Sequence, residues 1–218
     1  LLILQQQLRK NLSKKNPSTF YGISLVASLI KIDYALELLE TQGLLPLQEF
    51  WSKLQKEETK AAKYIMKAEE IQNAISLTSS LTSKNIKHPK LYLLRGIIKK
   101  ELVQNPNAKF MVFANYRNTI EEILDFLNKE NEIKATKLIG QKSGLTQKQQ
   151  IETIKDFEEG KYNIMVGTSI SEEGINIEGG AELAIFYDIV PSEIRTIQRK
   201  GRGGRMQAGK IIFLVTNN

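Results

Sequence analysis

The stretch AKFMVFANYRNTIEEILDFL, residues 108–127, decides the fold of this chain. Its first seven residues form a short apolar run that follows the turn cluster Asn105-Pro106-Asn107. Further along, apolar residues recur at helical spacing, and they are Ile120, Ile123, Leu124 and Leu127. A buried strand that leads directly into an amphipathic helix is the unit from which parallel sheets are built.

The alternation of strand and helix continues to the end of the chain. Further strands are predicted at residues 134–139, 162–166, 182–187 and 210–215. The capping pairs Asn118–Glu121 and Thr146–Gln149 predict the starts of two helices. A third helix is predicted to begin at Pro191. We therefore expect an α/β domain over residues 106–218, with a parallel sheet covered on both faces and ligands beyond the carboxyl ends of its strands.

Residues 1–105 show a different period and no alternating strand pattern. Apolar residues spaced three and four apart predict helices at residues 28–41, 46–70 and 89–103. We expect an all-helical domain over residues 1–105, joined to the sheet domain after residue 105. Trp51 should lie in the core of this domain, and His88 should be merely solvated.

The composition excludes several classes of function. The 218 residues contain no cysteine and one histidine, which argues against disulfides, thiolate zinc sites, histidine-rich metal centres and a Ser-His-Asp triad. No apolar run approaches the roughly 20 residues that span a bilayer, so we expect no membrane partner. We predict no metal site and a cytoplasmic location, or a nuclear one in a eukaryote. The start at Leu1 rather than Met favours a fragment of a longer chain.

The whole net charge of +7 lies in the first half. Residues 1–107 carry 16 Lys/Arg against 9 Asp/Glu, whereas residues 108–218 carry 15 of each. Such an excess is typical of a surface that faces a polyanion. A lysine-rich solvated helical face explains the same counts equally well.

The segment QRKGRGGR, residues 198–205, is the strongest functional signal. Gln198, Arg202 and Arg205 are spaced i, i+4 and i+7, so a helix would place them on one face. Arginine forks bind phosphate oxygens bidentately and stay charged at any working pH. A generic basic turn on a nucleic-acid backbone is the alternative interpretation.

The segment GTSISEEGIN, residues 167–176, directly follows a predicted strand. Its small hydroxyl side chains and backbone N–H groups are suited to holding a phosphate. A Ser/Thr helix cap, with Glu172 and Glu173 in the first turn, fits the same residues.

Four segments, in this order, resemble motifs IV, IVa, V and VI of the superfamily 2 helicases. They are FANYR at 113–117, Gly140-Gln141, and the segments 167–176 and 198–205. Together with FYDIVPSEIR at 186–195, the stretch from residue 138 to 205 is most similar to the archaeal Hef and Fanconi anaemia group M family, and residues 28–103 resemble its helical insertion. The resemblance implies a RecA-like second motor domain preceded by a DNA-gripping helical insertion. Such a chain would be the C-terminal part of an ATP-dependent DNA helicase or translocase that acts on branched or forked DNA in repair.

The resemblance also implies roles for individual residues. Arg202 and Arg205 would be catalytic arginine fingers on the γ-phosphate of ATP. Contacts around the bound nucleotide would come from Gln198, Arg199 and Asn176, and Arg199 would pair there with acidic residues of a first motor domain. Backbone contacts to nucleic acid would come from Asn115, Arg117, Gln141, Gly167 and Thr168. Asn176 stands where the family often has aspartate, and Gly203 stands where threonine is usual.

Two parts of an ATPase are missing from this sequence. The stretch GRMQAGK at 204–210 imitates a phosphate loop, but Ile211 replaces the required hydroxyl residue, and no Asp is followed by Glu. ATP with Mg²⁺ would therefore be bound mainly by a first RecA-like domain of the same protein, and this chain alone should not hydrolyse ATP. Two alternatives remain open. One is an RNA helicase of the Dicer and innate-sensor type, and the other is a non-catalytic nucleic-acid-binding scaffold with a degenerate motor.

Overall fold

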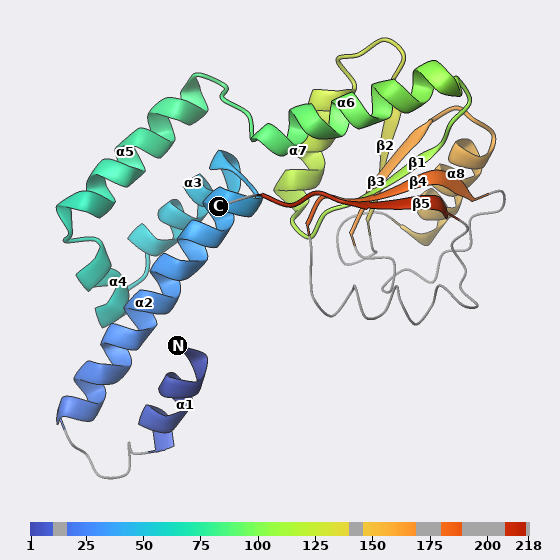
Figure 1. The fold of residues 1–218 in the computed structure, drawn as a ribbon. Helices are drawn as coiled ribbons and strands as arrows, with labels where there is room; N and C mark the ends of the chain where they lie inside the picture. The colour runs from blue at the N-terminus through green and yellow to red at the C-terminus, as the bar shows by residue number, and fades with distance from the viewer. Residues whose placement is uncertain (11–16, 140–145, 169–179, 189–207, 217–218) are drawn as a thin grey trace. The chain divides into compact units, whose positions relative to one another are not determined.

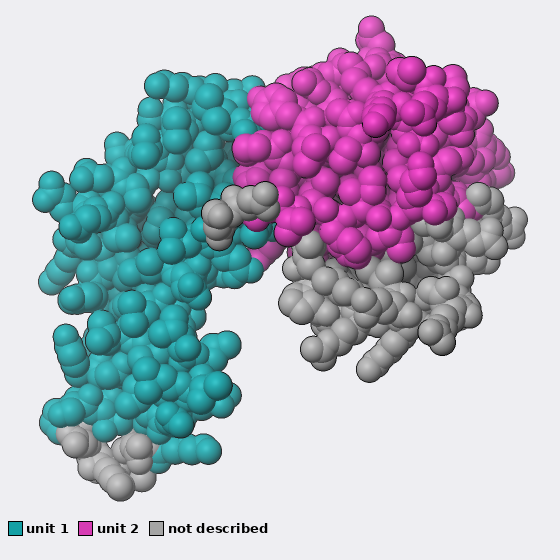
Figure 2. Space-filling model, in the orientation of Figure 1, with its two compact units in different colours: residues 1–87 teal, residues 88–218 magenta. Residues whose placement is uncertain are grey.

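The computed structural model describes residues 1–10, 17–139, 146–168, 180–188 and 208–216. It divides the chain into two compact units, residues 1–87 and residues 88–218 (Figure 2). Within the described ranges, no helix is long and apolar enough to cross a membrane.

The described part of the first unit is all helical. Its helices are α1 (Leu2–Lys10), α2 (Pro17–Thr41), α3 (Leu44–Gln55), α4 (Lys60–Ile65) and α5 (Glu69–Ser83) (Figure 1). Helix α2 packs against α1, α3 and α4, and α3 also packs against α5. Trp51 of α3 is only 5% exposed, so the prediction that it is a core residue is confirmed.

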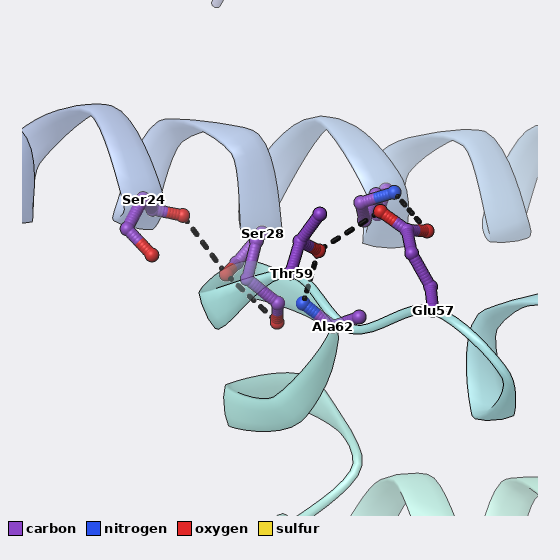
Figure 3. Close-up of polar contacts among 7 residues, drawn as sticks. Ser24, Ser28, Glu57, Thr59 and Ala62 are labelled. Carbon is purple, nitrogen blue, oxygen red and sulfur yellow. Dashed lines mark hydrogen bonds and ion pairs between the residues drawn. The ribbon is translucent and has the colours of Figure 1, made fainter.

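The single helix predicted at residues 46–70 is wrong, because the chain forms α3, α4 and the start of α5 there. Helix α3 ends at Gln55, and Thr59 starts the next helix. The Thr59 hydroxyl oxygen accepts the Ala62 N–H at 3.2 Å and caps α4, and the same hydroxyl donates to Glu57 at 2.9 Å (Figure 3). Lys31 of α2 donates to the Glu57 carboxylate at 2.7 Å. A break of a few residues leaves the apolar period almost in phase, so periodicity alone does not detect it.

Ser28 of α2 links this helix to α4. Its hydroxyl lies 3.0 Å from the carbonyl oxygen of Ser24 and 3.4 Å from that of Ala61 (Figure 3). Ser28 is buried, and a buried hydroxyl group needs such acceptors. The contact fixes α4 against the N-terminal half of α2.

The second unit is a five-stranded parallel sheet with helices on both faces. Its strands are β1 (Phe110–Phe113), β2 (Ala135–Leu138), β3 (Ile164–Gly167), β4 (Ala181–Phe186) and β5 (Ala208–Phe213), in the order β2-β3-β1-β4-β5. Its described helices are α6 (Pro89–Gln104), α7 (Arg117–Leu127) and α8 (Gln147–Glu158). All five predicted strands and the α/β class are confirmed. The helix predicted to begin at Pro191 lies outside the described residues.

Alternate residues of the strands point into two separate cores. Val112 of β1 packs in one core with Leu94 of α6 and Ile123 of α7. Phe113 faces the other core together with Phe157 of α8. The expected coverage of both sheet faces is therefore present, with α6 and α7 on one face and α8 on the other (Figure 1).

Helix α6 belongs to the sheet unit, although the sequence grouped it with the helical half. Leu91, Leu94, Ile98 and Leu102 are all buried in the core that lies against the sheet. The structure thus divides the chain after residue 87, whereas the sequence placed the boundary after residue 105. An amphipathic helix buries its apolar stripe wherever a complementary face exists, and the stripe alone does not say which domain supplies that face.

The helix caps follow the sequence only in part. Thr146 and Gln149 form the predicted capping box of α8. Helix α7 begins at Arg117 with Tyr116 as its N-cap, so the predicted start at the Asn118–Glu121 pair is wrong. The Nδ1 atom of His88 accepts the Lys90 N–H at 3.1 Å, so His88 caps α6 and is not merely solvated.

Candidate nucleic-acid interface

Strands β1 and β3 are neighbours, and this brings two predicted loops to the same edge of the sheet. Phe113 is the register partner of Gly167, and the Ala114 N–H donates to the Gly167 carbonyl oxygen at 2.9 Å. The chain leaves these strands at Asn115 and at Thr168. The structure therefore brings together Asn115, Arg117, Gly167 and Thr168, four of the five predicted nucleic-acid contacts; their role as phosphate ligands stays a prediction.

The loop after β1 presents donor groups at this edge. Asn115 and Arg117 are exposed, and Arg117 is the first residue of α7. The side chain of the N-cap residue, Tyr116, makes no capping hydrogen bond, and the first turn of α7 carries no acidic residue. A helix N-terminus with these properties attracts anions through its backbone N–H groups.

Gly167 has a structural reason to be glycine. A Cβ atom at this position would lie 2.6 Å from the backbone carbonyl oxygen of Leu138 in β2. No real Cβ contact is that short, and backbone cannot move away as a side chain can. The missing side chain at residue 167 is therefore required by the packing of β3 against β2, whether or not a phosphate binds there.

A buried ion pair lies behind the loop that begins at Asn115. Lys90 of α6 and Asp188, two residues after β4, approach to 3.7 Å, and their side chains are only 5% and 4% exposed. The second carboxylate oxygen of Asp188 accepts the Asn115 backbone N–H at 2.9 Å. The Lys90 ammonium donates to the Tyr187 carbonyl oxygen at 2.8 Å and lies 4.5 Å from the centroid of the Tyr187 ring.

The pair sits in a strongly desolvated environment. Burial lowers the pKa of Lys90, and the charge and hydrogen bond of Asp188 oppose that shift. Burial also raises the pKa of the Tyr187 phenol, with a smaller contribution from the charges of Asp188 and Glu122. The Tyr187 hydroxyl is buried and has no hydrogen-bond partner among the described residues. Loss of either partner alone would leave a buried charge without compensation, which is strongly destabilising.

Comparisons with known proteins agree with this architecture. Residues 93–207 match the family model described as "Helicase conserved C-terminal domain", which covers more than half of the chain. Residues 1–86 match the model described as "Putative ATP-dependent RNA helicase, helical bundle". The chain belongs to the helicase conserved C-terminal domain family. It is a superfamily 2 helicase C-terminal domain with a helical bundle before it, as the resemblance implied.

The sequence similarity to individual relatives covers most of this chain. "Putative ATP-dependent RNA helicase MJ1505" of Methanocaldococcus jannaschii is 39% identical over 197 residues, which is 88% of this chain and 25% of that protein. "ATP-dependent DNA helicase mph1" of Neurospora crassa is 35% identical over 213 residues, which is 90% of this chain and 18% of that protein. The chain thus spans a quarter or less of the length of these relatives.

A solved structure shares both the fold and the sequence. The crystal structure of the Pyrococcus furiosus Hef helicase domain is 36% identical, with a TM-score of 0.78 over 98% of this chain and 45% of that chain. The similarity extends across the helical bundle and the sheet unit of the helicase domain.

Lys90 and Asp188 were missed by the sequence reasoning. Asp188 is a polar residue two positions after the apolar strand β4, and such positions at the carboxyl edge of a parallel sheet are candidates for a site. Lys90 offered no comparable signal, because it lies 97 residues before its hydrogen-bond partner Tyr187.

The remaining predicted site residues of the helicase domain lie outside the described residues. They are Gln141, Asn176, Gln198, Arg199, Arg202 and Arg205. The described residues contain no cluster of three or more His, Cys, Asp or Glu that could hold a metal ion. The sequence pattern argued against Lys210 as a phosphate-loop lysine. In the structure Lys210 lies inside strand β5 and not at the start of a helix.

Part of the positive charge counted in residues 1–107 is neutralised within the sheet unit. Arg95 and Lys99 of α6 both pair with Glu130, at 2.9 and 2.6 Å. The hydrogen bond from Lys99 lowers the pKa of Glu130. These two cations therefore support α6 on its own domain, so the charge count overstates the surface left to face a polyanion.

Proposed function

We propose that this chain is the C-terminal part of an ATP-dependent DNA helicase or translocase that acts on branched or forked DNA in repair. The observation that carries the proposal is the pairing of β1 with β3, which places the loop at Asn115–Arg117 beside Thr168. Family membership and the fungal relative named as a DNA helicase support it. The preference for branched or forked DNA rests on the resemblance alone.

In this proposal the interface reads the backbone and not the bases. Arg117 and the backbone N–H groups at the start of α7 are suited to phosphate oxygens, which carry no sequence information. Binding should therefore weaken with salt and depend little on sequence. Thr168 and Gln141 would extend the same contact along the nucleic-acid strand.

The nucleotide would be shared with another part of the protein. ATP with Mg²⁺ would be bound mainly by the first RecA-like domain, which would also be the partner of Arg199. Gln198 and Asn176 would contact the nucleotide from this side, and Arg202 and Arg205 would stabilise charge on the transferred phosphoryl group. Hydrolysis of the bound ATP supplies the free energy for movement.

RNA is the second candidate substrate. Two similarities favour it, since the helical-bundle family and the Methanocaldococcus relative are both described as putative RNA helicases. Phosphate-directed contacts do not by themselves separate DNA from RNA, because the 2′-hydroxyl decides that difference.

The test compares the affinities for two nucleic-acid substrates and the effect of removing one positive charge. The affinity of the full-length protein for forked DNA and for double-stranded RNA is measured at the same series of salt concentrations. We expect forked DNA to bind more tightly, and Arg117→Ala to weaken binding and to lower the salt slope by about one. Lys129→Ala is the matched control, because Lys129 is exposed just beyond the opposite end of α7. Tighter binding of RNA would favour the second candidate, and equal effects of both variants would contradict the interface.

A further inference from the structure

We propose that Lys90 and Asp188 are positioning residues of the nucleic-acid interface, which end the pairing of β1 with β4 and hold the main chain at Asn115. The proposal rests on the proposed function, because it concerns how that loop is set for binding.

The hydrogen bonds at the end of the two strands carry the proposal. The Tyr187 N–H donates to the Phe113 carbonyl oxygen at 2.8 Å, as the parallel register requires. In a regular parallel ladder the next bond would run from the Asn115 N–H to the Tyr187 carbonyl oxygen. The structure instead joins the Asn115 N–H to the Asp188 carboxylate and the Tyr187 carbonyl oxygen to the Lys90 ammonium.

Two side chains thus replace one rung of the ladder. Each takes over one of the two backbone groups that would have bonded to each other, and the ion pair between them closes the gap. The strands stop pairing at this point, although both backbone groups remain satisfied. The main chain at Asn115 is released from the sheet two residues before α7 and is still held at a fixed place.

The replaced rung lies between β1 and β4, from which the chain continues toward opposite edges of the sheet. From β1 the chain leads by way of α7 to β2 on one side, whereas from β4 it leads to β5 on the other. Ligands of open α/β sheets bind outside the strand ends at such a point. Apolar side chains would fill the buried volume as stably as an ion pair. They would leave the Asn115 N–H and the Tyr187 carbonyl oxygen to bond to each other, so that the ladder would continue by one rung; keeping these two groups apart is the specific contribution of the ion pair.

The experiment compares two double variants of the full-length protein. Both replace Lys90 with Met, so neither leaves a buried charge alone. Lys90→Met/Asp188→Asn keeps an amide oxygen that can accept the Asn115 N–H, whereas Lys90→Met/Asp188→Leu removes this side-chain acceptor and leaves only the Tyr187 carbonyl oxygen, which would draw Asn115 back into the ladder. We expect the leucine variant to bind forked DNA roughly tenfold more weakly than the asparagine variant, the change produced by losing one hydrogen bond of ordinary strength.

Melting temperatures and a matched control separate positioning from loss of folding. Lys99→Met/Glu130→Gln removes another ion pair of α6, at the surface, and should leave DNA affinity unchanged. Equal DNA affinities of the two Lys90 variants would overturn the inference while leaving the proposed function intact, provided that Arg117→Ala still weakens binding. If Arg117→Ala binds normally, the proposed interface itself is wrong.

A measurement on the unaltered protein covers the case in which the leucine variant does not fold. Amide hydrogen exchange at Asn115 should be slow, because its N–H is bonded to a buried carboxylate. Exchange at the rate of an unprotected loop amide would overturn the inference.

Discussion

Gly167 and Leu138 approach so closely that a Cβ atom on residue 167 would lie 2.6 Å from the Leu138 carbonyl oxygen. The two residues are register partners in β3 and β2, so the contact is between backbones. The resemblance to helicases predicted Gly167 as a contact to the nucleic-acid backbone. Its position in the sheet adds a second requirement for glycine that is independent of any ligand.

Gly167→Ala should therefore lower the free energy of unfolding of the sheet unit by about 1–3 kcal/mol, because an extra methyl group meets backbone that cannot yield. Far-UV circular dichroism during chemical denaturation measures the loss. Gly96→Ala in α6 is the control: a Cβ there meets nothing within 4 Å, and helix propensity should stabilise the protein by about 0.5–1 kcal/mol. Equal effects of the two changes would contradict the close contact.

Glu57 should make the stability of the helical unit depend on pH in the acid range. The hydrogen bond from Lys31 lowers the pKa of Glu57 from its ordinary value, and Thr59 contributes in the same direction. A lowered carboxylate pKa stabilises the folded state above the unfolded pKa, and that contribution is lost as the pH falls through the folded value. Glu57→Gln should cost less than about 1 kcal/mol at pH 7 and nothing at low pH, since the pair is partly exposed.

Trp51 provides the measurement for this prediction. It is the only tryptophan of the chain and is buried in the helical unit, so its fluorescence reports unfolding of that unit. Glu49→Gln is the control, because the Glu49–Lys53 pair is long, at 3.9 Å, and exposed. A stability difference for Glu57→Gln that persists unchanged at low pH would show that the ion pair is not its source.

The chain studied as an isolated polypeptide should not hydrolyse ATP. Its sequence contains neither a Gly-Lys-Ser/Thr phosphate loop nor an Asp-Glu pair, and both are needed to hold the phosphates and magnesium. Phosphate release by a clean preparation, with and without forked DNA, is the assay. Turnover that follows the chain through purification would sink the idea of a missing first motor domain.

Arg202→Ala in the full-length protein should lower DNA-stimulated ATP turnover on the order of 10³-fold or more, the usual contribution of an arginine finger. DNA affinity should be largely retained, because the residue is assigned to the nucleotide. Lys129→Ala, which removes an exposed cation elsewhere, should change neither quantity. Lost DNA affinity with surviving turnover would assign Arg202 to the nucleic acid instead.

The sequence alone determined the kind and order of the elements in the sheet unit. The strands and the helices between them differ in the period of their apolar residues, and that period is a local property of the backbone. It also determined that Asn115 and Thr168 follow strands of one parallel sheet, and hence that both lie at its carboxyl edge.

Only the tertiary structure decided which unit α6 joins, why Gly167 must be glycine and which residues hold the main chain at Asn115. Each of these depends on a contact between segments far apart in the chain, as between Lys90 and Tyr187, which are 97 residues apart. Local patterns show that a side chain will be buried, but the partner that satisfies a buried charge is chosen only when the chain has folded back on itself.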